Sequence, residues 1–156
     1  MRLTVIFTGK TKVWYLKEGV DEYLKRMERY APLSSITIPD PKISGKPERE
    51  QVKLIEGEHI LKKIRPGEYV ILLDEVGQMF DSVGFAKHLS SLEGRTGHVV
   101  FVVGGPYGFS DEVYGRADEK ISLSAMTFSH QMVRLIFTEQ LYRAYTILKG
   151  EPYHHN

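Results

Sequence analysis

A glycine-rich turn directly after an apolar run is the part of this sequence with the clearest chemical meaning. Residues 99–103 are all apolar and mostly β-branched, which is typical of a strand buried on both faces of a parallel sheet. Gly104, Gly105 and Gly108 follow, and they allow the backbone to turn sharply and to approach a ligand closely. Ser110 stands where a helix N-cap is expected. Strand, glycine turn and helix together predict a small-molecule site at the carboxyl edge of an α/β sheet.

Other patterns resemble known binding motifs but fail in detail. Gly9-Lys10-Thr11 resembles the end of a phosphate-binding loop, but that motif requires glycine at position 4, where Thr4 stands. The turn at residues 104–109 does not match the dinucleotide-binding pattern, and Pro106 lacks the amide that a pyrophosphate would need. His154-His155 has no nearby carboxylate or third ligand, so we expect no metal site there.

Strand-like and helix-like segments alternate along the chain and would position these residues. Strands are expected at residues 3–7, 36–38, 69–73, 99–103 and 121–123. Helices are expected at residues 13–30 and 48–63, after a cap at Asp81 or Ser82, after Ser110, and at 131–149. This alternation predicts one α/β domain over residues 1–156, with a doubly wound and mainly parallel sheet.

The last expected helix is apolar around most of its circumference. Its apolar residues are Met132, Val133, Leu135, Ile136, Phe137, Leu141, Tyr142, Tyr145, Ile147 and Leu148. A helix at the edge of a protein shows a single apolar stripe. We therefore expect this helix to be buried on two sides, either deep within the fold or against another subunit.

Composition limits the class of protein. The chain has 156 residues, of which 42% are hydrophobic and 26% charged, as in a globular domain rather than a disordered segment. It has no cysteine, which excludes disulfides, zinc–thiolate sites and thiol nucleophiles. The net charge of +1 argues against binding nucleic acid by charge alone, so RNA binding would need local patches. Because no signal-like or membrane-length apolar run is seen, we expect a cytoplasmic protein without a membrane partner.

Several short segments, taken in order, resemble a known family. They are Leu72-Leu73-Asp74, Gly104-Gly105-Pro106-Tyr107-Gly108, residues 123–130, Leu141-Tyr142-Arg143-Ala144 and Pro152-Tyr153-His154. In this order and spacing, they resemble the SPOUT class of knotted methyltransferases. More narrowly, they resemble the bacterial family that methylates N3 of a pseudouridine in 23S rRNA. The resemblance covers essentially the whole chain.

The resemblance implies a C-terminal trefoil knot over about residues 70–156, a homodimer, and a pocket for S-adenosylmethionine. The implied cofactor-binding residues are Leu73, Gly104, Gly105, Leu123, Ser124, Ala125, Met126, Thr127, Phe128 and Ser129. Their types suit the ligand, since adenine needs an apolar slot with backbone groups along its edge and glycine permits close approach. No metal is implied, because the sulfonium is already a strong electrophile.

The resemblance also implies the chemistry of the acceptor. N3 of the target base carries a weakly acidic proton, so a general base or a cation that stabilises the imide anion is expected. The candidates are His154 as the base, Arg143 as a contact for phosphate or the oxyanion, and His130. Tyr153 could stack on an unstacked base. Which side chain takes the proton stays open, and His155 stands where the family usually has a basic residue.

Rival interpretations accompany these assignments. Arg143 could simply pair with Glu139 on the helix surface, and His130 could cap a helix or lie in the core. Residues 124–129 could be an ordinary loop, and the terminal histidines could be a frayed end. Two other functions also stay open: the same fold and cofactor acting on another RNA, such as a tRNA base, or a non-catalytic module on the ribosome. For a methyltransferase with so little net charge, we expect a ribosomal particle as the substrate rather than naked RNA.

Overall fold

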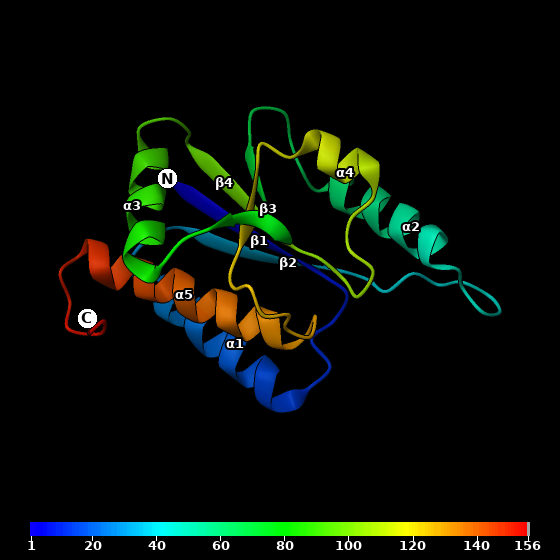
Figure 1. Cartoon of the computed structure of the whole chain (residues 1–156), viewed down its shortest axis with the longest axis horizontal. Coiled ribbons are helices and arrows are strands. Elements are labelled where there is room, and N and C mark those ends of the chain that lie inside the picture. The colour runs from blue at the N-terminus through cyan, green and yellow to red at the C-terminus, as the bar shows by residue number, and fades with distance from the viewer. Residues whose placement is uncertain (156) are drawn as a thin grey trace.

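The structure, a computed structural model, describes residues 1–155 and is built from alternating strands and helices (Figure 1). The strands are β1 (Arg2–Thr8), β2 (Leu33–Ile38), β3 (Tyr69–Met79), β4 (His98–Val103) and β5 (Glu119–Ser122). The helices are α1 (Trp14–Met27), α2 (Arg49–Lys62), α3 (Ser82–Glu93), α4 (Asp111–Arg116) and α5 (Met132–Leu148). None of the helices in this part of the chain has the length and apolar character needed to cross a membrane.

All strands belong to one sheet with the order β2-β1-β4-β3-β5, and every described pairing is parallel. This confirms the predicted α/β architecture. Because parallel strands all run the same way, their carboxyl ends lie at one edge of the sheet. The loops that follow β4 and β5 therefore meet at that edge (Figure 1). The trefoil knot over residues 70–156 stays a prediction.

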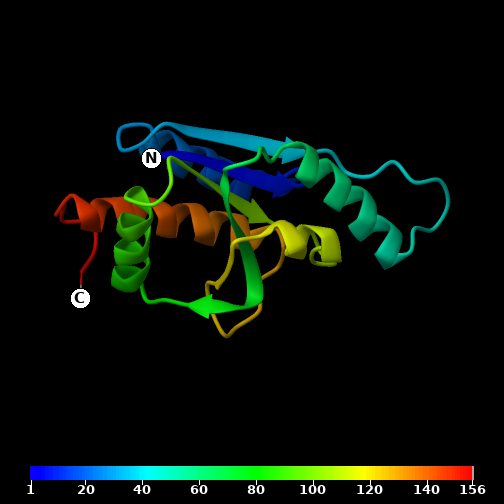
Figure 2. The same cartoon turned by 90° about the horizontal axis from the view of Figure 1, so that it is seen from above.

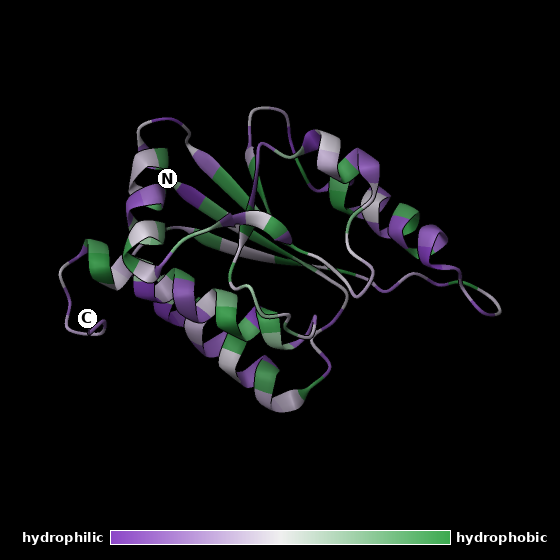
Figure 3. Ribbon diagram, in the orientation of Figure 1, coloured by the Kyte–Doolittle hydropathy of each residue, from purple (hydrophilic) through white to green (hydrophobic). Residues whose placement is uncertain are grey.

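Strand β4 is buried on both faces, as its unbroken apolar run predicted. Val99, Phe101 and Val103 belong to the core beneath α1, α3 and α5, and these side chains are at most 1% exposed. Val100 and Val102 belong to a second core, beneath α2 and α4. Side chains alternate between the two faces of a strand, so one strand supplies both cores. The apolar strands lie between the two helical layers in Figure 3.

Helix α5 is enclosed on two sides. It packs against α1 and against α3, and Phe137, Leu141 and Ala144 reach the core above the sheet. Every residue from 132 to 147 is buried or partly buried. Packing within a single chain thus explains why this helix is apolar around most of its circumference.

Strand β3 is longer than the strand predicted at residues 69–73. After Leu73 its pairing with β5 shifts register, and pairing resumes at Gln78. Between these points, Asp74 Oδ1 accepts a hydrogen bond from the amide of Val76 at 2.9 Å. This local turn draws residues 74–77 out of the ladder. The predicted end of the strand at Leu73 is therefore a bend, and the strand continues to Met79.

Two predicted helix caps are confirmed. Asp81 begins α3 and accepts a hydrogen bond from the amide of Gly84 at 2.7 Å. Ser110 begins α4 and accepts one from the amide of Val113 at 3.4 Å. Each cap satisfies an amide that has no partner within its helix. The cap at Ser110 also fixes where the chain leaves the glycine turn.

Candidate functional site

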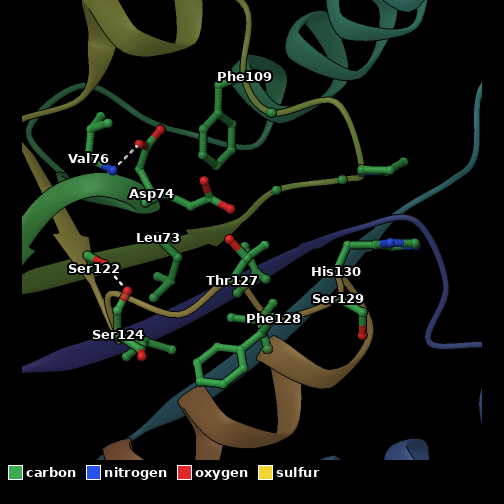
Figure 4. A pocket seen from close by; sticks show the side chains of 18 of the residues that line it. Leu73, Asp74, Val76, Phe109, Ser122, Ser124, Thr127, Phe128, Ser129 and His130 are labelled. Carbon is green, nitrogen blue, oxygen red and sulfur yellow. Dashed lines mark hydrogen bonds between the residues drawn. The ribbon is translucent and has the colours of Figure 1, made fainter.

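A cavity of about 620 Å³ opens where the loops after β4 and β5 meet residues 73–76, which lie within β3. Its walls are residues 73–76, residues 103–109 and most of residues 121–130, with Tyr114 and Val133 (Figure 4). This volume lies within the range typical of small-molecule sites, about 300–1,000 Å³. The site is therefore at the sheet edge that the glycine turn predicted.

Nearly all of the predicted cofactor-binding residues line this cavity. Those that do so are Leu73, Gly104, Gly105, Leu123, Ser124, Met126, Thr127, Phe128 and Ser129. Ala125 lies in the same loop but is not part of the lining. The fold thus brings together three segments that are far apart in the sequence. Their role in binding a cofactor stays a prediction.

The glycine turn does two different things. Gly108 has a φ of 81°, a left-handed conformation that other residues rarely adopt. Gly105 is needed for space instead, because a Cβ there would lie 3.0 and 3.1 Å from the two carboxyl oxygens of Glu56. Helix α2 thus packs its Glu56 directly behind the wall of the cavity.

The serines of the loop before α5 hold that loop in shape. Ser124 Oγ accepts a hydrogen bond from the amide of Met126 at 2.9 Å, and the Ser124 carbonyl accepts one from the Ser122 hydroxyl at 3.0 Å. Ser129 Oγ accepts a hydrogen bond from the amide of Met132 at 3.1 Å, at the start of α5. The loop is therefore a preformed wall of the cavity.

The bend in β3 adds a polar wall that the sequence analysis did not include among the site residues. Asp74 Oδ2 accepts a short hydrogen bond from the Tyr114 hydroxyl, and both residues line the cavity. Burial and this hydrogen bond raise the pKa of Tyr114 to about 12, so it stays protonated at neutral pH. In the sequence, the one signal for Asp74 is that a charged residue directly follows an apolar strand. No local signal indicated Tyr114.

His130 lies at the cavity, next to the start of α5. Burial, and the positive charges of Arg134 and Lys12, lower the pKa of its imidazole. The ring is therefore neutral at pH 7 and has one nitrogen free to accept a proton. It does not lie in the core, and the α5 cap interaction comes from Ser129.

Arg134, which the sequence analysis did not single out, is the largest fully buried side chain. Its guanidinium donates hydrogen bonds to the carbonyl oxygens of Thr8, Gly9 and His130 at 2.6, 2.8 and 3.1 Å. A further bond reaches Thr11 Oγ1 at 2.9 Å. Arg134 thus fastens the loop after β1 to the start of α5.

The remaining predicted residues form a separate cluster near the C-terminal end of α5. Arg143 donates to Glu139 Oε1 through Nε at 3.0 Å and through Nη2 at 2.7 Å. Its guanidinium lies 4.7 Å from the centroid of the Tyr153 ring, and the Tyr153 hydroxyl donates to the same Glu139 oxygen at 3.1 Å. We call Glu139, Arg143, Tyr153 and His154 the tail cluster. The rival surface pair with Glu139 exists, as one contact within this larger network.

The hydrogen bond to His154 fixes its tautomer. Arg143 Nη1 lies 3.2 Å from His154 Nδ1. Because a guanidinium only donates, Nδ1 must accept, and the ring proton of the neutral imidazole is on Nε2. In this arrangement His154 presents a donor, Nε2–H, suited to an oxygen of a base or phosphate. The hydrogen bond between His154 and Arg143 would have to break before His154 Nδ1 could act as a base.

The cavity and the tail cluster lie at opposite ends of α5. His130 precedes the helix, whereas Arg143 is eleven residues after its first residue, Met132. At 1.5 Å per residue this is a separation of roughly 15 Å or more along the helix axis. Figures 1 and 2 show the C-terminus beyond the far end of α5, away from the loop that precedes the helix. Within one chain, the structure does not bring Arg143, Tyr153 and His154 to the cavity.

Among residues 1–155, no group of three or more His, Asp or Glu side chains is placed to hold a metal ion.

Comparison with known proteins gives one consistent result. A family described as "Predicted SPOUT methyltransferase" matches residues 1–154. A protein of Parabacteroides distasonis named "Ribosomal RNA large subunit methyltransferase H" is 51% identical over 156 residues, covering 99% of both chains. A protein with the same name from Christiangramia forsetii is 49% identical, and the match covers 99% of both chains. Another from Trichlorobacter lovleyi is 47% identical, and the match covers 99% of this chain and 100% of the relative.

Proposed function

The chain belongs to the SPOUT methyltransferase family, and on that premise we propose that it methylates a base of large-subunit ribosomal RNA with S-adenosylmethionine as the donor. The observation that carries the proposal is the meeting of residues 73–76, 103–109 and 121–130 around one cavity. The names of the relatives favour ribosomal RNA over the tRNA alternative.

The cavity fits such a donor in size and chemistry. Its apolar lining, which includes Leu73, Leu123 and Phe128, suits an adenine ring, and Gly104 and Gly105 present backbone to the cavity. Asp74 and Glu75 add carboxylates, which attract a cation. When bound, the donor supplies a methyl group on a positively charged sulfur.

The protein's part in the reaction is to position the acceptor and manage one proton. Holding an acceptor nitrogen in line with the methyl group supplies most of the catalysis expected for such a transfer. His130 is a neutral imidazole at the cavity and can accept the proton that leaves the acceptor. Arg143 and the Nε2–H of His154 can stabilise negative charge on the base or bind its phosphate.

We propose a finer assignment of the substrate as well: N3 of a pseudouridine in 23S rRNA, reached in an assembled ribosomal particle. The tail sequence Pro152-Tyr153-His154 supports it through the family resemblance. The net charge of +1 supports the particle, because a small and nearly neutral protein gains little affinity from RNA phosphates alone.

We further propose that the protein acts as a homodimer in which the tail cluster of one subunit completes the cavity of the other. The separation along α5 supports this, because Arg143 and His154 cannot serve the cavity of their own chain. A two-fold dimer repeats every contact, so both cavities would be completed in the same way.

The decisive test of the proposed function is mass spectrometry of 23S rRNA from cells that lack this gene. The expected result is the loss of one methyl group from one pseudouridine, restored by the wild-type gene. In a second assay, S-adenosylmethionine at about 100 times its dissociation constant should stabilise the purified protein by about 2.7 kcal/mol. Unchanged rRNA methylation, or a melting temperature that the donor leaves unmoved, would contradict the proposal.

A further inference from the structure

Glu56 of helix α2 is a buried carboxylic acid directly behind the wall of the cavity. It is 5% exposed, and both of its carboxyl oxygens lie within 3.1 Å of the point where a Cβ on Gly105 would stand. Its Oε1 is buried and accepts no hydrogen bond from residues 1–155. A buried acceptor without a partner costs free energy, so it calls for a compensating role.

The charges around Glu56 leave it poised between its two protonation states. Asp40, in the loop after β2, repels its negative charge, whereas Arg134 of α5 attracts it. Beside Gly57, the start of α4 and its cap present the uncharged Val113 and Ser110, and His59 lies three residues after Glu56 on α2. Burial is the largest effect and, with Asp40, raises the pKa of Glu56 to about 7. A modest change of charge in the cavity is then enough to ionise it.

We propose that Glu56 is a positioning residue for the methyl donor: it loses its proton when the cationic donor enters the cavity, and the resulting carboxylate holds the donor's positive charge against the glycine turn. The inference rests on the proposed function. It follows from the wall being thin at Gly105, where no side chain separates the carboxyl group from the cavity lining. The product of the transfer has a neutral sulfur, so an ionised Glu56 favours the donor over the product.

The test is calorimetric binding of S-adenosylmethionine and of S-adenosylhomocysteine to the full-length protein at pH 7, in two buffers with different ionisation enthalpies. Because Glu56 is about half protonated at that pH, binding the donor should release about half a proton. Binding the neutral homocysteine compound should release markedly less. In Glu56→Gln the release on donor binding should vanish, and the preference for donor over product should fall roughly tenfold, the equivalent of one pKa unit.

Two further variants make the result specific. Glu58→Gln removes an exposed carboxylate of the same helix and should behave like the wild type. Asp40→Asn removes the charge that repels Glu56, so the proton release at pH 7 should shrink although Glu56 itself is intact. Asp40 is half exposed, so the exchange should leave the fold unchanged.

Equal proton release in the wild type and in Glu56→Gln would overturn the inference, as would a wild type that releases no proton at pH 7. Both outcomes leave the proposed function standing, because they require that the donor binds. Failure of the wild type to bind S-adenosylmethionine at all would instead overturn the proposed function. Should Glu56→Gln fold poorly, Asp40→Asn decides the matter, since an unchanged release there contradicts the proposed origin of the proton.

Discussion

Two arginines on α5, nine residues apart, hold the two ends of the helix in different ways. Arg134 is completely buried, and three of its four described hydrogen bonds go to backbone carbonyl oxygens. Arg143 is partly buried, and its described bonds go to the side chains of Glu139 and His154. Arg134 therefore holds backbone segments together, whereas Arg143 holds side chains together.

The difference teaches what each end of the helix is suited to do. Backbone acceptors cannot rotate away, so Arg134 gives the cavity a fixed frame in which His130 and the loop after β1 are held together. Side-chain partners can exchange, so Arg143 can leave Glu139 or His154 for an oxygen of a substrate. The cavity end is preorganised for a small ligand, whereas the tail cluster is able to respond to a large one.

Removing Arg134 should cause the largest loss of stability. In Arg134→Met the carbonyl oxygens of Thr8, Gly9 and His130 lose their donor, and we expect a cost of about 3–5 kcal/mol. Urea unfolding measures it directly. Arg143→Met, the same exchange nine residues on, is the control and should cost about 1 kcal/mol or less, because its ion pair is partly solvated. Equal losses in the two variants would remove the distinction between the two arginines.

Removing Arg143 should instead cause the largest loss of activity. We expect Arg143→Ala to lower methyl transfer by a factor of roughly 10²–10³, as for the loss of one charged group that stabilises a transition state. Donor affinity should be unchanged, since we assign Arg143 to the acceptor base or its phosphate and since Arg143 does not line the cavity of its own chain. A methylation assay on ribosomal particles, together with calorimetric titration of the donor, separates the two effects.

Mixed dimers show whether the two ends cooperate across subunits. Gly105→Val should distort the cavity, because its side chain would run into the carboxyl group of Glu56 and displace the glycine turn that forms the wall. A dimer of one Gly105→Val and one Arg143→Ala subunit retains one complete composite site. An equal mixture of the two inactive variants should therefore recover about a quarter of wild-type activity, since half of the dimers are mixed and each has one working site. Without recovery, the tail cluster does not act across the dimer.

Much of the cavity end could be predicted from the sequence, because its signals are local. The apolar run of residues 99–103, the caps at Asp81 and Ser110, and the enclosed α5 are all confirmed. Each of these depends on neighbours within about one turn or one strand. The glycine turn and residues 123–130 also meet at one cavity, as the family resemblance implied.

Two contacts at the cavity that the sequence did not indicate join residues distant in sequence. Tyr114 reaches Asp74 only because β3 bends after Leu73, and Glu56 reaches Gly105 only because α2 packs beneath the loop after β4. No periodicity or cap predicts such contacts, since the sheet order decides which loops become neighbours.

Glu56 makes the cavity end less stable than it could be, in a way that depends on pH. Its pKa is raised from 4.5 to about 7 in the folded state, so the folded protein binds more protons than the unfolded chain between these values. The wild type should lose stability as pH rises from about 4.5 to 7, with an effect of about 2–3 kcal/mol. Glu56→Gln should lack this loss and be the more stable protein at pH 8. A difference between the two that does not change with pH would contradict the raised pKa.

The smallest effect is expected at the bend of β3, where the cavity wall depends on a side chain rather than on backbone. Tyr114→Phe removes the hydroxyl that holds Asp74, so the bend should loosen and donor affinity should fall by about 1 kcal/mol, or roughly fivefold. Tyr107→Phe is the matched control, because Tyr107 also lines the cavity but its hydroxyl has no described hydrogen bond within residues 1–155. Calorimetric titration of S-adenosylmethionine compares them. If both variants lose affinity equally, the hydroxyls matter through the ligand itself, and the bend does not depend on Asp74 and Tyr114. If only Tyr114→Phe is affected, this part of the cavity wall depends on contacts between side chains, as the tail cluster does. The remainder of the wall is then held by backbone contacts.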